Sequence, residues 1–289
     1  MAGLEPARRL RQGILSPRCL PFHHISALHI IISRRYYVKM KEVISVSGIQ
    51  IGAGKPKVCI PVSGKTVEEV QAAFKHALEQ GADILEFRLD SILEEPDFNK
   101  ASEYMRIFEN RNGVPLLMTY RSQAEGGKGR GHWEKQRDML LALMAERESD
   151  LIDLEISHPA YDVLLACAAE YKIPVVASMH FFDRTPERSE IFSKLDRAGS
   201  AAILKFACMP QKEEDVLRVM ELALEAEKKY CRPVIAIAMG RMGVLSRIGA
   251  ELCHCCMTFG NAGEQSAPGQ PSAVWLKETI NKIHLEMRK

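Results

Sequence analysis

The sequence lacks a long hydrophobic run, an excess of one charge and a regular arrangement of cysteines. No apolar segment approaches the roughly 20 residues that a bilayer-spanning helix requires, so we expect no membrane partner. Lys and Arg total 39 and Asp and Glu total 37 among 289 residues, a balance that argues against nucleic acid as a partner. The eight cysteines show no long-range pair of CxxC motifs, which favours a reduced, cytosol-like compartment over a disulfide scaffold.

The basic residues are concentrated at the start of the chain. Residues 1–40 contain seven basic residues and one acid, which leaves 32 basic and 36 acidic groups in the rest. A segment rich in arginine and poor in acids is typical of an organellar transit peptide. We favour a second interpretation, in which Met40 is the true start and residues 1–39 are a mis-assigned, disordered extension. We therefore expect a cytoplasmic protein, and an organellar one only if residues 1–39 are a transit peptide.

From residue 57 onward, short apolar runs alternate with amphipathic stretches. The apolar runs begin near Lys57, Ile84, Leu116, Leu151, Val175, Ala202, Val234 and Cys256. Thr66 and Glu69 form a capping box at the start of the first amphipathic stretch, and Gly81 ends that stretch. The spacing predicts another helix over about 213–230. Its apolar face is predicted to carry Leu217, Met220 and Leu224.

Eight β-then-α units within residues 40–289 predict a single-domain (β/α)₈ TIM barrel, a fold that typically needs about 250 residues. The main alternative, a doubly wound open sheet, carries a glycine-rich fingerprint after its first strand, and residues 63–66 lack that spacing. Two short apolar runs, 43–46 and 49–51, are separated by a Ser-Gly pair. They predict a small β-hairpin that closes the bottom of the barrel.

Several predicted strands carry charged or polar side chains near their carboxyl ends, although strands buried on both faces are normally apolar. These residues are Glu86 and Arg88, Asp153 and Glu155, Ser178 and His180, and Lys205. Residues two positions apart in a strand project to the same face. Any single pair is best explained as a structural ion pair beneath the helices. Four such strands, polar at the end where barrel enzymes have their active sites, predict a functional site.

Lys205 has the most specific chemistry of these residues. A lysine in an apolar strand loses hydration, and Arg88, Arg121 and Arg247 are candidate cationic neighbours. Both effects favour the neutral amine, which attacks ketones to form a Schiff base. His180, one strand earlier, is a candidate general acid/base at neutral pH. A buried histidine alone is more often a core residue, so the assignment of His180 depends on the neighbouring lysine.

Three loop segments add candidates at the same end of the barrel. The loop after the third strand contains Arg121 and Glu125, with glycines that suggest mobility. Arg247 follows the seventh strand, and Ser266 and Gln270 follow the eighth. An arginine can bind a carboxylate through two hydrogen bonds, while hydroxyl and amide groups can bind substrate hydroxyls. From spacing alone, a plain Pro-Gly turn is the stronger interpretation of the last segment.

Six motifs occur in order along residues 40–289. They are EFRLD at 86–90, TYRS at 119–122 with EGG at 125–127, the strand end at His180, the segment from Lys205 to Met209 and Pro210, GVLSR at 243–247, and SAPGQ at 266–270. Together they closely resemble the type I 3-dehydroquinate dehydratase family of the shikimate pathway. The resemblance implies a (β/α)₈ barrel, a homodimer, and dehydration of 3-dehydroquinate in chorismate and aromatic amino acid biosynthesis. It also implies that no metal or cofactor is used.

The resemblance implies a role for each matching residue. Lys205 becomes the Schiff-base lysine, His180 the general acid/base, and Glu125 the carboxylate that supports His180. Arg247 becomes the residue that binds the substrate carboxylate. The other matches are the substrate-contacting residues Glu86, Arg88, Arg121, Ser266 and Gln270, with Asp153 as an acidic residue behind them.

Two positions depart from the family pattern. A serine that contacts substrate in some members aligns with Pro61 here, although Ser63 is close. The residue after His180 is Phe181 rather than an acid or amide, and Asp183 follows two positions later. Neither departure affects the lysine chemistry.

Two other functions fit parts of the sequence. A Schiff-base aldolase would share the barrel and the lysine, but most aldolases need a phosphate site built from backbone amides after strands seven and eight. A metal-binding module could use residues 253–256 (Cys-His-Cys-Cys), but four consecutive ligands cannot surround one zinc ion. We expect these thiols to pack on a helix next to Leu252 and Met257, and we expect no metal site.

Overall fold

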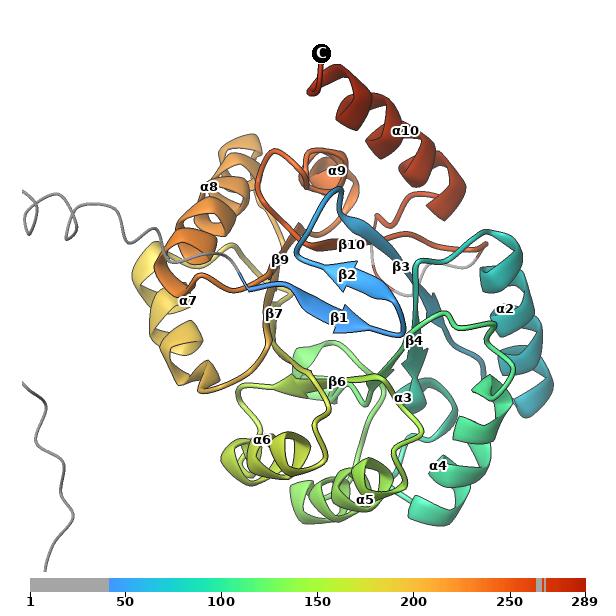
Figure 1. The fold of residues 1–289 in the computed structure, drawn as a ribbon. Helices are drawn as coiled ribbons and strands as arrows, with labels where there is room; N and C mark the ends of the chain where they lie inside the picture. The colour runs from blue at the N-terminus through green and yellow to red at the C-terminus, as the bar shows by residue number, and fades with distance from the viewer. Residues whose placement is uncertain (1–41, 264–266, 268) are drawn as a thin grey trace, which may run out of the picture. The chain divides into compact units, whose positions relative to one another are not determined.

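A closed sheet of eight parallel strands forms the centre of the protein (Figure 1). The computed structural model describes residues 42–263, 267 and 269–289, so the predicted leader lies outside the described residues. The strands, in their order around the sheet, are β10 (Met257–Phe259), β3 (Lys57–Val62), β4 (Ile84–Arg88), β5 (Leu116–Thr119), β6 (Leu151–Glu155), β7 (Val175–Phe181), β8 (Ile203–Cys208) and β9 (Val234–Ala238). Each begins within one residue of its predicted start.

Backbone hydrogen bonds through Cys256 close the ring between the first and last strands of the sheet. The N–H of Cys256 donates to the carbonyl of Val234 at 2.8 Å, and the N–H of Lys57 donates to the carbonyl of Cys256 at 3.0 Å. The predicted (β/α)₈ barrel is therefore confirmed.

Helices follow the strands and surround the barrel (Figure 1). They are α2 (Val67–Glu79), α3 (Leu89–Ile92), α4 (Phe98–Met105), η1 (Arg106–Phe108), η2 (Gln123–Glu125), α5 (Trp133–Glu146), α6 (Tyr161–Glu170), α7 (Arg188–Leu195), η3 (Asp196–Ala198), α8 (Glu213–Tyr230), η4 (Arg241–Gly243), α9 (Val244–Ile248) and α10 (Ala273–Glu286). None of the described helices is long and apolar enough to cross a membrane.

The predicted start of α2 is confirmed by the hydrogen bond between its capping residue and the first turn of the helix. The hydroxyl of Thr66 accepts a hydrogen bond from the N–H of Glu69 at 3.3 Å. The carboxylate of Glu69 accepts from the N–H of Lys65 at 2.6 Å rather than from that of Thr66, so the reciprocal bond of the capping box is shifted by one residue. Gly81 follows the helix with a φ of 70°, a conformation that glycine adopts without strain.

The bounds predicted for α8 are right, but its predicted apolar face is only partly right, since Met220 is partly buried and packs against the core. Leu217 is 58% exposed. The residues of α8 that are buried against the barrel are Asp215, Val216, Val219, Leu222, Ala223 and Ala226. Both sets follow helical spacing, and the smaller side chains are the ones that pack against the strands.

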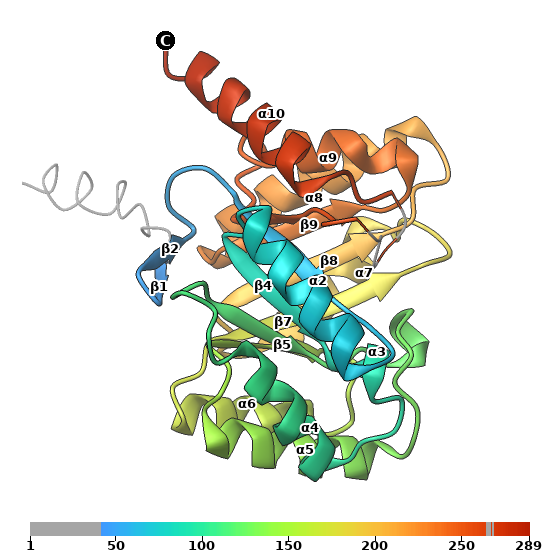
Figure 2. The same ribbon diagram turned by 90° about the vertical axis from the view of Figure 1, so that its right-hand side faces the viewer.

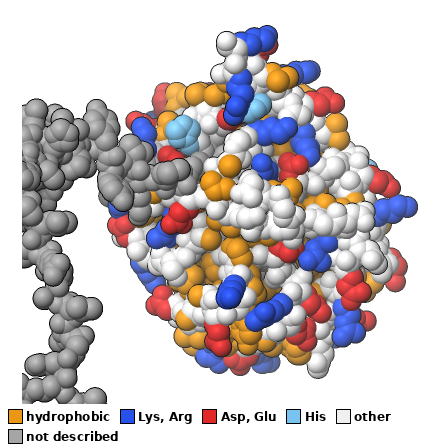
Figure 3. Space-filling model, viewed as in Figure 1, with side chains coloured by type: hydrophobic (Ala, Val, Ile, Leu, Met, Phe, Trp, Pro, Cys, Tyr) orange, Lys and Arg blue, Asp and Glu red, His pale blue; other side chains and the backbone are white. Residues whose placement is uncertain are grey.

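The predicted N-terminal hairpin is confirmed at the bottom of the barrel. Strands β1 (Ile44–Val46) and β2 (Ile49–Ile51) pair antiparallel and lie across one end of the barrel in Figures 1 and 2. Val46 and Ile51 are buried in an apolar cluster with residues from the amino-terminal halves of the strands. The hydroxyl of Ser47 donates to the carboxylate of Asp150 at 2.9 Å. Figure 3 shows this face, on which basic and acidic side chains are interspersed.

The lumen therefore changes character from bottom to top. Its lower part is apolar and includes Cys59, Ile84, Leu117, Leu151, Val176 and Ile203. Its upper part, toward the carboxyl ends of the strands, contains buried Glu86, Asp153, Ser178 and Lys205. The apolar lower part supports the barrel, and the charged upper part is available for chemistry.

We predict that Ile51→Ala lowers the free energy of unfolding by about 2–5 kcal/mol, the usual cost of such a truncation at a fully buried site. Val43→Ala is the matched control, because Val43 precedes the same hairpin and is exposed. Denaturant unfolding of both variants measures the difference. Equal stabilities would show that the hairpin does not contribute to closing the barrel.

Candidate active site

A cavity of about 100 Å³ opens at the carboxyl ends of the strands. Its lining includes eight of the nine site residues predicted from the sequence: Glu86, Arg88, Arg121, Glu125, His180, Lys205, Arg247 and Gln270. The ninth, Ser266, lies outside the described residues. The fold thus brings together side chains that are up to 184 positions apart.

Lys205 projects from β8 into the lumen, as predicted, while Leu204 and Phe206 pack in the cluster between the sheet and the helices. Its amine donates a hydrogen bond to Asp153 Oδ2 at 2.9 Å. The amine also lies 3.9 Å from Glu86 Oε1 and 4.7 Å from the centre of the ring of Phe259. The sequence indicated cationic neighbours, whereas the groups in contact with the amine are carboxylates and an aromatic ring.

Asp153 is the buried carboxylate that joins Lys205 to the rest of the site. It accepts hydrogen bonds from Arg121 Nη2 at 2.7 Å and from the hydroxyl of Ser178 at 2.6 Å. Burial opposes ionisation of Asp153, but the positive charges of Arg121 and Lys205 outweigh it and hold its pKa well below the usual range. Asp153 therefore remains a carboxylate throughout the physiological range.

His180 and Glu125 form a second pair in the cavity. His180 Nδ1 lies 2.9 Å from Glu125 Oε2, and the hydroxyl of Ser157 donates to the other oxygen of Glu125 at 2.6 Å. Burial, with a contribution from the charge of Glu155, raises the pKa of Glu125 to about 7. Burial also lowers the pKa of His180 well below its usual value, and Arg121 and Lys205 lower it further. The imidazole is therefore neutral at neutral pH and able to accept a proton.

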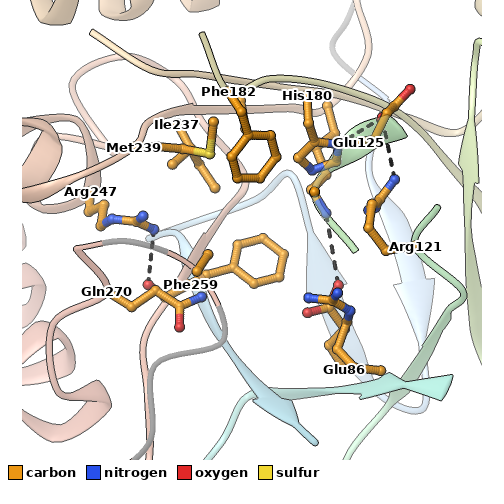
Figure 4. A pocket seen from close by; sticks show the side chains of 15 residues that line it. Glu86, Arg121, Glu125, His180, Phe182, Ile237, Met239, Arg247, Phe259 and Gln270 are labelled. Atoms are coloured by element: carbon orange, nitrogen blue, oxygen red, sulfur yellow. Dashed lines mark hydrogen bonds and ion pairs between the residues drawn. The ribbon is translucent and has the colours of Figure 1, made fainter. Parts of the chain in front are cut away.

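Arg247 lies on the opposite side of the cavity from His180 (Figure 4). It is only 1% exposed, and burial lowers its pKa to about 10. Nη1 donates to the carbonyl of Phe259 at 3.2 Å, and Nε has no hydrogen-bond partner among the described residues. No described carboxylate forms an ion pair with it, so this buried cation is suited to bind an anionic group of a ligand.

Apolar residues that the sequence analysis missed separate the two charged sides of the cavity. Figure 4 shows Phe182, Ile237, Met239 and Phe259 in this position. Ile237 and Met239 are two residues apart, at and just beyond the end of β9, and this spacing could have placed both on the lumen face. The ring of Phe182 lies against Gly126, where any side chain would overlap it.

The two departures from the family pattern lie away from the cavity lining. Pro61 and Ser63 line a separate cleft beside α2. The ring of Phe181 lies 5.9 Å from the guanidinium carbon of Arg184, and the side chain of Asp183 is 78% exposed. None of these four residues lines the cavity that contains Lys205.

The prediction for the cysteine-rich segment is half right. Cys253, Cys255 and Cys256 are buried, but they lie in a turn and in the segment just before β10 rather than on a helix. His254 has a φ of 57°, a left-handed conformation that a helix does not allow. Within the part of the chain that the structure describes, no cluster of three or more His, Cys, Asp or Glu side chains could hold a metal ion.

Comparison with known proteins shows the family of this chain. The family described as type I 3-dehydroquinase matches residues 58–287. The chain belongs to the type I 3-dehydroquinase family. It is 36% identical over 259 residues to the 3-dehydroquinate dehydratase of Clostridioides difficile and 34% identical over 253 residues to that of Bacillus licheniformis. Each alignment covers 85% of this chain, with 98% and 99% of the respective relatives.

Solved structures of 3-dehydroquinate dehydratases share the fold. The enzyme of Clostridium difficile with covalently modified comenic acid matches with a TM-score of 0.81 and 33% identity, over 86% of this chain and 100% of that one. The 3-dehydroquinate dehydratase of Geobacillus kaustophilus matches with a TM-score of 0.80 and 28% identity, over 84% and 97%.

We predict that His180 stays neutral to a lower pH than an ordinary histidine, because protonation would bury a charge beside Arg121 and Lys205. Nitrogen-15 NMR of the imidazole ring across pH 5–8 measures this, with the resonance assigned by its loss in His180→Gln. A midpoint at or above the usual value of about 6.5 would contradict the electrostatic description of the site.

Proposed function

We propose that the protein dehydrates 3-dehydroquinate to 3-dehydroshikimate through a Schiff base on Lys205. The observation that carries the proposal is the buried amine of Lys205 in one cavity with the His180–Glu125 pair and with the cation of Arg247, which has no acidic partner among the described residues. The names of the relatives support the substrate, and the covalent modification named for the Clostridium difficile structure supports covalent chemistry.

Binding of the substrate uses the two sides of the cavity. Arg247 binds the carboxylate, because it is a buried cation without an acidic partner among the described residues. Gln270, Glu86 and Arg88 line the cavity and offer hydrogen bonds to the ring hydroxyls, and we assign Ser266 to the same role from the resemblance. Arg121 also lines the cavity, where its guanidinium already bonds to acidic groups.

The first chemical step joins Lys205 to the substrate. After losing a proton, the amine attacks the C3 ketone, and one water leaves as the iminium forms. The iminium carries a positive charge at the place of the original ammonium. Asp153 and Glu86 lie 2.9 and 3.9 Å from that nitrogen, so their negative charges stabilise the intermediate in the buried site.

The second step removes a proton from C2 and the hydroxyl from C1. The iminium accepts the electron pair of the C2–H bond, and neutral His180 takes the proton. Because Nδ1 of His180 contacts Glu125, Nε2 is the atom available to the substrate. The resulting enamine expels the C1 hydroxyl, and His180 returns the proton to it, which releases water. Hydrolysis of the imine then consumes one water and frees the product and Lys205.

We also propose that the protein is a homodimer that acts in the cytoplasm, in chorismate and aromatic amino acid biosynthesis, and that residues 40–289 form its catalytic domain. The resemblance to the family supports these assignments, and the chemistry proposed above does not depend on the homodimer, the compartment or the pathway. The chemistry uses only groups from a single chain.

We predict that Lys205→Ala abolishes the adduct that borohydride traps in the presence of 3-dehydroquinate, because this lysine supplies the nitrogen of the Schiff base. Intact-mass spectrometry before and after reduction measures the adduct. Lys229→Ala is the control, since Lys229 lies on the exposed side of α8 and pairs with Asp196. A substrate-dependent mass increase in Lys205→Ala would refute the assignment.

We predict a different result for His180→Ala. The variant keeps the lysine and should still form the reducible adduct, while kcat falls roughly a hundred- to ten-thousand-fold, the usual contribution of a general acid/base. Absorbance of the enone product measures kcat. His76→Ala, at an exposed position on α2, controls for loss of an unrelated histidine. Unchanged turnover in His180→Ala would remove His180 from the mechanism.

A further inference from the structure

Asp90 is a buried carboxylate to which the mechanism above assigns no role. It follows β4 in the first turn of α3 and has no solvent exposure. Its two oxygens accept four hydrogen bonds. Arg88 donates from Nε and Nη2, both at 2.8 Å, and the backbone N–H groups of Arg121 and Lys128 donate at 3.2 and 3.0 Å. All four donors belong to segments of the active site.

The two backbone donors mark the ends of the loop that carries Glu125. Arg121 follows β5, Lys128 lies seven positions later, and Glu125 is between them. Asp90 therefore holds both ends of this loop with one side chain. The same carboxylate fixes the guanidinium of Arg88, which lines the cavity.

Backbone hydrogen bonds fold the loop tightly on itself. The N–H of Gly129 donates to the carbonyl of Arg121 at 3.0 Å, and the N–H of Gln123 donates to the carbonyl of Gly129 at 3.1 Å. A side-chain carbon at Gly127 would overlap the carbonyl oxygen of Arg121. These glycines allow two backbone segments to approach closely, and Asp90 bonds to both segments at that point.

The charge of Asp90 matters as well as its position. Arg88 is largely buried, with 15% of its side chain exposed, and Asp90 is the carboxylate within ion-pair distance of it among the described residues. A neutral group in place of Asp90 would leave the guanidinium without its partner and would weaken the hydrogen bonds to the loop.

We propose that Asp90 is a positioning residue that fixes Arg88 and the Glu125 loop in one arrangement. Substrate binding by Arg88 and support of His180 by Glu125 then depend on a single carboxylate that does not itself line the cavity. The inference rests on the proposed function for its kinetic consequences. Its structural consequence, a loop held by Asp90, does not depend on any substrate.

Asp90→Asn tests the proposal, because asparagine keeps the shape but presents an NH₂ group where one oxygen accepted. We expect KM to rise and kcat to fall together, with kcat/KM lower by roughly ten- to a hundredfold, as for loss of charge-assisted hydrogen bonds. The matched control is Asp150→Asn. Asp150 also binds an arginine, Arg111, and the backbone N–H of Leu116, but at the bottom of the barrel. It should lose thermal stability and keep both kinetic constants.

Hydrogen–deuterium exchange without substrate supplies the second readout. Exchange over residues 121–130 should accelerate in Asp90→Asn and not in Asp150→Asn. A variant that is less stable but has wild-type KM, kcat and loop exchange would overturn the proposal, because it would make Asp90 merely structural. If the wild-type protein does not convert 3-dehydroquinate, the proposed function fails, and the exchange result still decides the role of Asp90.

A backbone variant covers the case in which Asp90→Asn does not fold. Lys128→Pro removes one backbone N–H that donates a hydrogen bond to Asp90. The side chain of Lys128 is exposed, and the carboxylate of Asp90 stays in place. Compared with Lys128→Ala, which keeps that N–H, it should accelerate loop exchange and lower kcat with less effect on KM. Identical exchange and kcat in the two Lys128 variants would contradict the proposal.

Discussion

The contact between Asp153 and Lys205 is the interaction on which the rest of the site depends. A lysine in the lumen of a barrel loses its hydration, and contact with an opposite charge offsets that cost. Asp153 provides that pair, and its other partners, Arg121 and Ser178, extend the network to β5 and β7. The same carboxylate can neutralise an ammonium and then an iminium at one place. The negative charge that stabilises the iminium intermediate is therefore in place before the reaction begins.

The remaining charges follow from this network. Burial, together with the charges of Arg121 and Lys205, makes a third cation unfavourable here, which keeps His180 neutral and available as a base. A band of apolar side chains separates Arg247 from His180 (Figure 4). Arg247 has no acidic partner among the described residues. It can therefore gain more from binding a carboxylate than an arginine that is already paired. Among the described residues, the site thus combines a cation paired with a carboxylate for chemistry and a cation without an acidic partner for binding.

Much of this arrangement could be predicted from the sequence. The alternation of apolar runs with amphipathic stretches located the eight units, and charges in otherwise apolar strands indicated the site. The partners of Lys205 could not be predicted, because alternation gives the face of a residue but not which neighbour across the lumen reaches it. Helical spacing also allowed two faces for α8, and only packing against the barrel buried Val216 instead of Leu217. The close approach of two backbone segments at the glycines of the Glu125 loop could not be predicted either, since it leaves no signal of its own in the sequence.

The account is tested most directly by a crystal structure of the enzyme reduced with borohydride in the presence of 3-dehydroquinate. We expect continuous density from Nζ of Lys205 to C3 of the ligand, the ligand carboxylate on Arg247, and C2 facing Nε2 of His180. Asp153 should remain in contact with the new secondary amine. A ligand attached to another residue, or bound with its carboxylate away from Arg247, would contradict the account.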